Sequence, residues 1–181
     1  MSFIVSNLHV SLGSSKILKD INFSINEGQC VGILGPNGCG KSTLLRTLSG
    51  IIKPQSGVVE FKNNQLHSIK RSIRAKEIGF LSQSDVIPIM TTVRDYVALG
   101  RHPHRNYFRS GSTKDNEIID AAIEQCEIAH LKDRTIERLS GGERQRVRIA
   151  TLLSQCSSTI LLDEPFTGLD LEHQYSLLNL L

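Results

Sequence analysis

The sequence predicts an α/β fold with a helical subdomain, and three observations support this class. Segments typical of β-strands fill the first part of the chain, to about residue 84, and one more follows near residue 160. Between them, at about 85–138, apolar residues recur at helical spacing. Connections are short, and no Pro/Gly-rich linker is present. We therefore expect a single domain in which a helical insert interrupts an α/β core.

The strand-like segments differ in the burial that they predict. They are residues 3–12, 17–25, 29–35, 56–61, 78–83 and 158–164. The first two alternate apolar and polar residues, as half-buried strands do. A turn then leads into QCVGILG (29–35), a continuous apolar run that predicts a buried strand. STILLDE (158–164) has the same character and predicts a last buried strand.

Helix signals follow the glycine-rich stretch and dominate the insert. KSTLLRTLSG (41–50) reads as a helix that Gly50 closes. Capping-box spacing at Thr92/Asp95 and at Ser112/Asp115 predicts two helix starts. After the second start, apolar residues trace one helical face, at positions 118, 119, 122, 123 and 126. Residues 140–155 predict another helix, with an exposed basic face formed by Arg144, Arg146 and Arg148.

Composition narrows the function. The content of 39% apolar and 22% charged residues in 181 residues is that of a globular protein. A net charge of +3 with scattered basic residues predicts no nucleic-acid partner. No apolar run has the roughly 18 residues needed to span a bilayer, and the N-terminus lacks the pattern of a signal peptide. The four cysteines form no CxxC pair, which favours reduced thiols in a cytosolic protein.

The strongest motif is GPNGCGKS, Gly35 to Ser42, which fits G-x-x-x-x-G-K-[ST] at every fixed position. The glycines allow successive backbone N–H groups to face phosphate oxygens, and the following helix presents its positive end to them. Lys41 would reach the β- and γ-phosphates, and the Ser42 hydroxyl would ligate Mg²⁺. A strand followed by a helix is the context that this motif requires, so we predict a P-loop rather than a simple glycine-rich turn. Cys39 occupies a position that the motif leaves open to any residue, and a packing residue is favoured there over a redox switch.

An acidic pair completes the nucleotide chemistry. The strand segment TILL, with three apolar residues after Thr159, leads to Asp163, which would hold the metal through water. Glu164 follows and could accept a proton from the attacking water. Alone this pattern is weak, but together with the P-loop it favours nucleotide hydrolysis over simple binding.

LSGGERQRV, residues 139–147, resembles the signature motif of ATP-binding cassette (ABC) proteins. It lies between the P-loop, which that family calls Walker A, and the strand with the acidic pair, which it calls Walker B, in the order that the family uses. The resemblance implies a P-loop NTPase with a RecA-like core (1–84 and 139–181), an N-terminal antiparallel β subdomain and a helical subdomain (about 85–138). It implies that the 1–181 domain is incomplete at its C-terminus. The implied catalytic residues are Glu164, Gln83 and Lys41.

The same resemblance assigns the ligand contacts. The implied nucleotide-binding residues are Gly35, Pro36, Asn37, Gly38, Cys39, Gly40, Lys41, Ser42, Thr43, Gln83, Ser140, Gly141, Gly142, Asp163 and Asp170. The implied Mg²⁺ ligands are Ser42, Gln83 and, through water, Asp163. Ser140, Gly141 and Gly142 would contact the γ-phosphate of ATP held by the opposite subunit of a head-to-tail homodimer, with Asp170 at that interface. The N-terminus of the helix predicted there suits an anion.

Three positions depart from the family pattern. Leu12 falls where an aromatic residue usually stacks on adenine, so adenine contact would be apolar without stacking. Glu143 replaces the more frequent glutamine, a familiar variant. The switch histidine, which the family places roughly 30 residues beyond the Walker B glutamate, is missing. His173 is only nine residues past Glu164 and is interpreted as a surface or packing residue.

GRHPHRNYF (100–108) and DLEHQ (170–174) are similar to importer ATPases for iron-siderophore, haem and cobalamin. This resemblance implies a peripheral protein on the cytoplasmic side of the cell membrane. Its partners would be permease subunits, through the Q-loop at Gln83 and the helical subdomain, and indirectly a periplasmic or extracellular binding protein. His102, His104 and Arg105 would then belong to a coupling surface, with an exposed polar turn as the alternative and an iron site disfavoured.

Two other functions stay open on the sequence. One is a non-transport cassette acting on DNA or ribosomes, although the chain has no long coiled-coil insert and no second copy of the motifs. The other is a truncated cassette that binds ATP through an intact P-loop but does not turn over, because the switch histidine and closing strands are missing.

Overall fold

The computed structural model describes residues 2–83, 90–105, 112–166 and 174–175. The chain forms two compact units, Met1–Arg74 and Ala75–Leu181. No helix among the described residues is long and apolar enough to cross a membrane.

The first unit contains a four-stranded antiparallel sheet in the order β2-β1-β3-β4. Its strands are β1 (Phe3–Leu12), β2 (Ser15–Ile25), β3 (Ser56–Phe61) and β4 (Asn64–Gln65). Phe3 pairs with Ile25 on one side and with Phe61 on the other. Alternating side chains of β1 are buried, as the sequence pattern predicts, and the rings of Phe3 and Phe61 lie 5.0 Å apart. The expected strands at 3–12, 17–25 and 56–61 are confirmed.

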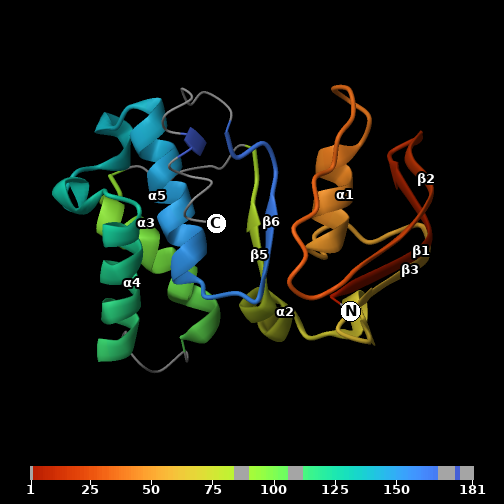
Figure 1. The fold of residues 1–181 in the computed structure, drawn as a ribbon, viewed down its shortest axis with the longest axis horizontal. Coiled ribbons are helices and arrows are strands. Elements are labelled where there is room, and N and C mark those ends of the chain that lie inside the picture. Colours follow the sequence, from red (N-terminus) through yellow and green to blue (C-terminus); the bar gives the residue numbers. More distant parts are fainter. Residues whose placement is uncertain (1, 84–89, 106–111, 167–173, 176–181) are drawn as a thin grey trace. The chain divides into compact units, whose positions relative to one another are not determined.

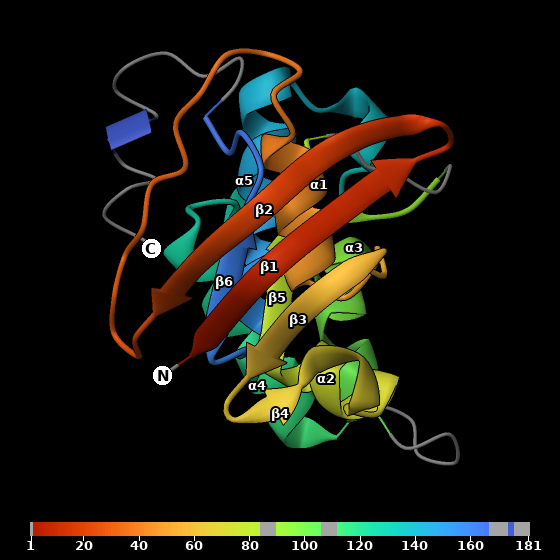
Figure 2. The same ribbon diagram turned by 90° about the vertical axis from the view of Figure 1, so that its right-hand side faces the viewer.

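Helix α1 (Lys41–Leu48) lies against one face of this sheet, behind β1 and β2 in Figure 2. It buries Leu44, Leu45 and Leu48. Gly50 follows the helix with φ +76°, a left-handed conformation that suits glycine, and its N–H donates to the carbonyl of Thr47. The predicted closure at Gly50 is therefore confirmed.

The predicted strand at 29–35 is wrong. Residues 29–34 have no strand pairing, and Val31 and Leu34 are 53% and 95% exposed. An apolar run becomes a buried strand only when a neighbouring strand accepts its backbone hydrogen bonds. The edges of the described sheet in this unit are β2 and β4, and neither pairs with this segment.

The second unit joins a parallel strand pair to a helical cluster (Figure 1). The strands are β5 (Ile78–Leu81) and β6 (Thr159–Leu162), and the helices are α2 (Arg71–Glu77, begun in the first unit), α3 (Val93–Ala98), α4 (Thr113–Gln125) and α5 (Gly141–Ser154). Short 3₁₀ helices are η1 (Leu66–Ser68, in the first unit), η2 (Leu99–His104), η3 (Ala129–Leu131) and η4 (Ile136–Arg138). Helices α3, α4 and α5 pack around one apolar core that includes Val97, Ile119, Ile123, Val147 and Ile149.

Both predicted capping signals are confirmed. Thr92 Oγ1 accepts a hydrogen bond from the N–H of Asp95 at 3.1 Å, and Ser112 and Asp115 form a complete capping box. The strand predicted at 158–164 forms as β6, but its burial was overestimated. Leu161 is 7% exposed while Ile160 is 37% exposed, because β6 pairs only with β5 among the described strands.

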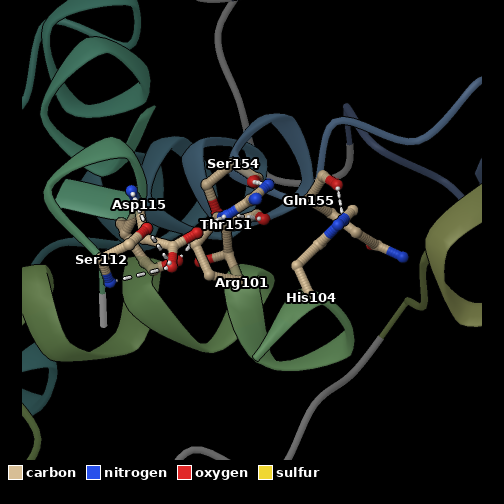
Figure 3. A network of polar contacts seen from close by, with 8 residues as sticks. Arg101, His104, Ser112, Asp115, Thr151, Ser154 and Gln155 are labelled. Carbon is tan, nitrogen blue, oxygen red and sulfur yellow. Dashed lines mark hydrogen bonds and ion pairs between the residues drawn. The ribbon is translucent and has the colours of Figure 1, made fainter. Parts of the chain in front are cut away.

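The GRHPH segment forms η2 and contacts the C-terminal end of α5 (Figure 3). Arg101 is buried, pairs with Asp115 at 2.8 Å and donates to the carbonyl of Ser154 at 2.9 Å. A Cβ on Gly100 would lie 2.1 Å from Ser154 Oγ and 2.2 Å from the carbonyl oxygen of Thr151. Only glycine therefore allows η2 to approach α5 so closely.

The histidines of this segment differ in their surroundings. His104 is half-buried, and its Nε2 lies 2.8 Å from the carbonyl oxygen of Gln155 (Figure 3). His102 and Arg105 are exposed. The alternative of an exposed polar turn is therefore wrong for His104, which is tied to α5. Among the described residues, no cluster of three or more His, Cys, Asp or Glu could hold a metal ion.

Candidate functional site

The P-loop, Gly35–Thr43, lies in the first unit and runs into α1. Gly38 and Gly40 have φ values of +79° and +102°, which let the loop turn back on itself. Lys41 begins the helix, and its Nζ donates to the carbonyl oxygens of Gly35 at 2.8 Å and Pro36 at 2.9 Å. These two bonds hold the ammonium group over the start of the loop. The loop therefore presents a lysine cation and a helix N-terminus together, which is a favourable arrangement for phosphate.

Gly40 also allows the loop to lie directly on β2. A Cβ at this position would lie 2.9 Å from Leu18 Cδ2 and 3.0 Å from Ile17 Cγ2. A larger residue would have to push the Leu18 and Ile17 side chains aside, in addition to adopting a left-handed φ. The second fixed glycine of the motif therefore suits both the turn and the close packing of the loop on β2.

Gln83 and Glu164 meet at the carboxyl ends of the two parallel strands in the second unit. Leu81 and Leu162 are register partners. Gln83 lies two residues after Leu81, and Glu164 lies two residues after Leu162. The N–H of Asp163 donates to the carbonyl of Leu81 at 2.9 Å, which continues the ladder. Gln83 Nε2 then donates to Glu164 Oε2 at 2.7 Å. Polar groups at the carboxyl ends of parallel strands are the usual position of ligand sites in α/β sheets.

The acidic pair has two different environments. Asp163 is 3% exposed, whereas Glu164 is exposed and has a φ of +52°. A left-handed conformation is uncommon for a residue other than glycine and costs of order 1 kcal/mol or more. Such strain persists only where the surroundings hold the backbone, and it places the Glu164 carboxylate beside Gln83.

The signature residues form the N-terminus of α5. Ser140 is the N-cap: its Oγ accepts from the N–H of Glu143 at 3.2 Å, and its own N–H donates to Glu143 Oε2 at 2.7 Å. Hydrogen bonds from the backbone and then the hydroxyl of Ser140 lower the pKa of Glu143. Gly141 and Gly142 are the first two residues of the helix. The sequence prediction that Ser-Gly-Gly opens a helix is confirmed.

The predicted exposed arginine face of α5 is wrong in part. Arg144 is exposed, but Arg146 donates to the carbonyl of Cys126 and pairs with Glu127. Arg148 donates to Gln145 Oε1 at 2.8 Å and to the carbonyl oxygen of Ser82.

Gln145 is buried, and its Nε2 donates to the carbonyl oxygen of Pro165 at 2.6 Å. The family motifs assign no role to Gln145 or Arg148. One sequence signal could have found Gln145: it lies at helical spacing with the buried residues Ile149 and Leu152.

Several predictions lie outside these contacts. Asp170 and His173 fall outside the described residues. Leu12 ends β1 and is 48% exposed. Lys41 and Ser42 belong to the first unit, and Asp163 and Glu164 belong to the second, so their union in one site stays a prediction.

All four cysteines lie in the described part of the chain and are free. Cys126 is buried, and burial raises the pKa of its thiol to about 12. Cys39, in the P-loop, is exposed.

Comparison with known proteins gives consistent matches. The family model of the ABC transporter matches residues 18–167. The iron(3+)-hydroxamate import ATP-binding protein FhuC of Bacillus subtilis is 41% identical over 180 residues, which cover 99% of this chain and 67% of that protein. The cobalamin import ATP-binding protein BtuD of Halobacterium salinarum is 40% identical over 174 residues, covering 96% of this chain and 43% of that protein. The chain thus spans less than half the length of this relative.

A solved structure agrees with the fold. The ATP-binding cassette MJ0796, determined as a dimer in a post-hydrolysis state with ADP and Pi, superposes with a TM-score of 0.85 and 28% identity over 98% of this chain and 80% of that one. The P-loop, the Gln83–Glu164 pair and the capped signature helix are the parts of the motif set that the structure describes. With a family model that matches most of the chain, they establish that it belongs to the ABC transporter ATP-binding family.

Proposed function

We propose that this chain is the ATP-binding and ATP-hydrolysing part of an ABC importer for an iron(III)-siderophore or a related metal chelate, such as haem or cobalamin. The observation that carries the catalytic part is the 2.7 Å hydrogen bond between Gln83 and Glu164 at the ends of β5 and β6. The matches to FhuC and BtuD, whose names state import of iron(3+)-hydroxamate and cobalamin, support the class of cargo.

The chemistry assigns a separate task to each part. Lys41 and the backbone N–H groups of the P-loop bind the β- and γ-phosphates of ATP. The Glu164 carboxylate accepts a proton from water as the water oxygen bonds to the γ-phosphorus, and the bond to the β–γ bridging oxygen breaks to give ADP and phosphate. Gln83 orients the Glu164 carboxylate through its amide N–H. The signature residues Ser140–Gly142 would face the phosphates of the opposite subunit in a head-to-tail dimer.

The donor atoms of this site fit Mg²⁺. This ion prefers oxygen ligands, and the buried Asp163 carboxylate and the Gln83 side-chain oxygen are of that kind, as is the Ser42 hydroxyl. When bound, Mg²⁺ neutralises charge that develops on the phosphate oxygens. We assign Ser42, Gln83 and Asp163, the last through water, to hold it.

A cavity of about 270 Å³ beside β5 is the place where we propose that a permease subunit docks. Its lining includes Phe80 from β5, Tyr96 from α3, and Leu99 and Pro103 from η2. Leu99 is 48% exposed, and β5 leads directly to Gln83. A partner seated here would contact both the helical subdomain and the strand that carries the Q-loop. The chain would then act at the cytoplasmic side of the membrane through this partner. A periplasmic or extracellular binding protein would be an indirect partner.

Replacing the P-loop lysine tests nucleotide binding. We expect Lys41→Met to raise the Kd for Mg-ATP roughly 10- to 100-fold, because a hydrogen bond to a charged group contributes about 1.5–3 kcal/mol. Titration with a fluorescent ATP analogue measures this change. Lys70→Met removes an exposed lysine of the same unit and is expected to leave the Kd unchanged. An equal Kd for wild type and Lys41→Met would contradict the assignment of the P-loop.

Growth on defined chelates tests the cargo. We expect a strain that lacks the protein to lose growth on at least one ferric siderophore, on haem or on cobalamin as the required source, and to grow normally on a simple iron salt. The wild-type gene restores growth and the Lys41→Met gene does not, because uptake needs ATP. Growth that is the same with and without the protein on every one of these sources would argue against the importer assignment.

A further inference from the structure

Helix α5 contacts both segments that carry the candidate catalytic pair. Gln83 follows β5 and Glu164 follows β6, and neither residue belongs to a helix or strand. Their 2.7 Å hydrogen bond therefore depends on how the two loop segments are held. The side chains that hold them come from the middle of α5, one turn beyond the signature residues.

The first contact lies next to Glu164. Gln145 Nε2 donates to the carbonyl oxygen of Pro165 at 2.6 Å, and Gln145 is 7% exposed. Pro165 directly follows Glu164, whose φ of +52° is a strained conformation. A bond to the next carbonyl group restrains the turn in which that strain is stored.

The second contact lies next to Gln83. Arg148 donates through Nη2 to the carbonyl oxygen of Ser82, which directly precedes Gln83, and through Nη1 to Gln145 Oε1 at 2.8 Å. Gln145 and Arg148 are three residues apart, so they lie on the same face of the helix. Together they form a continuous chain of hydrogen bonds from Pro165 through Gln145 and Arg148 to Ser82. Arginine suits this role because its planar group donates in two fixed directions, which a lysine cannot reproduce.

We propose that Gln145 and Arg148 are positioning residues for ATP hydrolysis. They act through the backbones beside Glu164 and Gln83, and they keep the glutamate carboxylate and the glutamine amide in contact. This inference rests on the proposed function, since Glu164 must be the base for the positioning to affect rate. It adds that the helix carrying the signature motif also sets the geometry of the catalytic pair in its own subunit.

Two variants and a matched control test the proposal. Gln145→Met keeps the length of the side chain and removes its hydrogen-bond donor. Arg148→Leu removes the guanidinium group that donates to Gln145 and Ser82. Arg94→Leu is the control, because Arg94 forms an ion pair with Asp120 and a hydrogen bond to Asn116, away from β5 and β6. The readouts are kcat and Kd for Mg-ATP, and amide hydrogen exchange in peptides covering residues 78–83 and 159–166.

We expect Gln145→Met and Arg148→Leu each to lower kcat at least about 10-fold, because small displacements of catalytic groups cost up to about 100-fold in rate. Kd should stay within about twofold, since the P-loop supplies phosphate binding. Exchange in both peptides should become faster, and Arg94→Leu should change none of these readouts. Arg148→Lys keeps the charge but loses the guanidinium group, so it should fall between wild type and Arg148→Leu. It also replaces Arg148→Leu if that variant does not fold.

The outcomes separate this proposal from the proposed function. Wild-type kcat and exchange in both Gln145→Met and the folded Arg148 variant would overturn the positioning role and leave the ATPase assignment intact. A wild-type chain that binds ATP without hydrolysing it would overturn the ATPase assignment. In that case the exchange rates still decide whether Gln145 and Arg148 hold the two segments.

Discussion

Glu164→Gln is expected to bind Mg-ATP as tightly as the wild type and to hydrolyse it about 100- to 10,000-fold more slowly, the range typical of a lost general base. The substitution is isosteric, and the new amide oxygen can still accept the hydrogen bond that Gln83 Nε2 donates at 2.7 Å. The geometry at the ends of β5 and β6 is therefore retained while the proton acceptor is lost. Quenched-flow measurement of phosphate release, with nucleotide binding titrated separately, resolves the two effects.

Glu117→Gln supplies the control for that experiment. Glu117 is exposed on α4, in the helical cluster. Its replacement by glutamine makes the same change of charge and shape as Glu164→Gln. Its rate is expected to equal that of the wild type. If Glu164→Gln also kept the wild-type rate, another group would have to act as the base.

Loss of the buried ion pair is expected to be the largest stability effect. Arg101→Met leaves the Asp115 carboxylate without its cation, and we expect the free energy of unfolding to fall by roughly 3 kcal/mol. This loss is at the low end of the range for buried pairs, because the side chains of Arg101 and Asp115 are still 8% and 12% exposed. The variant also loses the hydrogen bond to the Ser154 carbonyl that joins η2 to α5 (Figure 3). Urea unfolding at pH 7 measures the difference.

The same pair predicts a pH dependence. Hydrogen bonds from Arg101 first, and then from Ser112, lower the pKa of Asp115 below its ordinary value of 3.8 in the folded protein. The folded state therefore holds the proton less tightly than the unfolded state, and the stabilisation is present above about pH 4 and lost as the pH falls below it. The difference in the free energy of unfolding between wild type and Arg101→Met should therefore be smaller at pH 3 than at pH 7.

An exposed pair serves as the comparison. Arg94→Met breaks the ion pair with Asp120, whose side chain is 57% exposed, and is expected to change stability by less than about 1 kcal/mol. Equal losses for the two arginine variants would contradict the special role of the buried pair.

Local chemistry made parts of the fold predictable from sequence. Capping at Thr92 and at Ser112 depends on a partner only three residues away, so its spacing is visible in the chain. The alternation along β1 depends only on which face of a sheet is buried. These predictions needed no knowledge of distant contacts.

Features that depend on distant partners were not predictable in the same way. The run at 29–35 has the composition of a buried strand, but composition does not supply a neighbouring strand. Arg148 contacts Ser82 across 66 positions, so its place on a helix suggested only an exposed basic face. The family resemblance named Gln83 and Glu164 as catalytic residues but did not predict their contact, and the register of β5 and β6 gives the physical reason for it.

A single turnover tests whether this chain binds Mg-ATP and hydrolyses it. The unaltered chain is mixed in excess with radiolabelled ATP, and the bound nucleotide is recovered by acid quench. We expect the recovered nucleotide to be ADP, with one phosphate released for each ATP bound. Quantitative recovery of intact ATP from the folded, nucleotide-bound chain would show that this chain does not hydrolyse ATP.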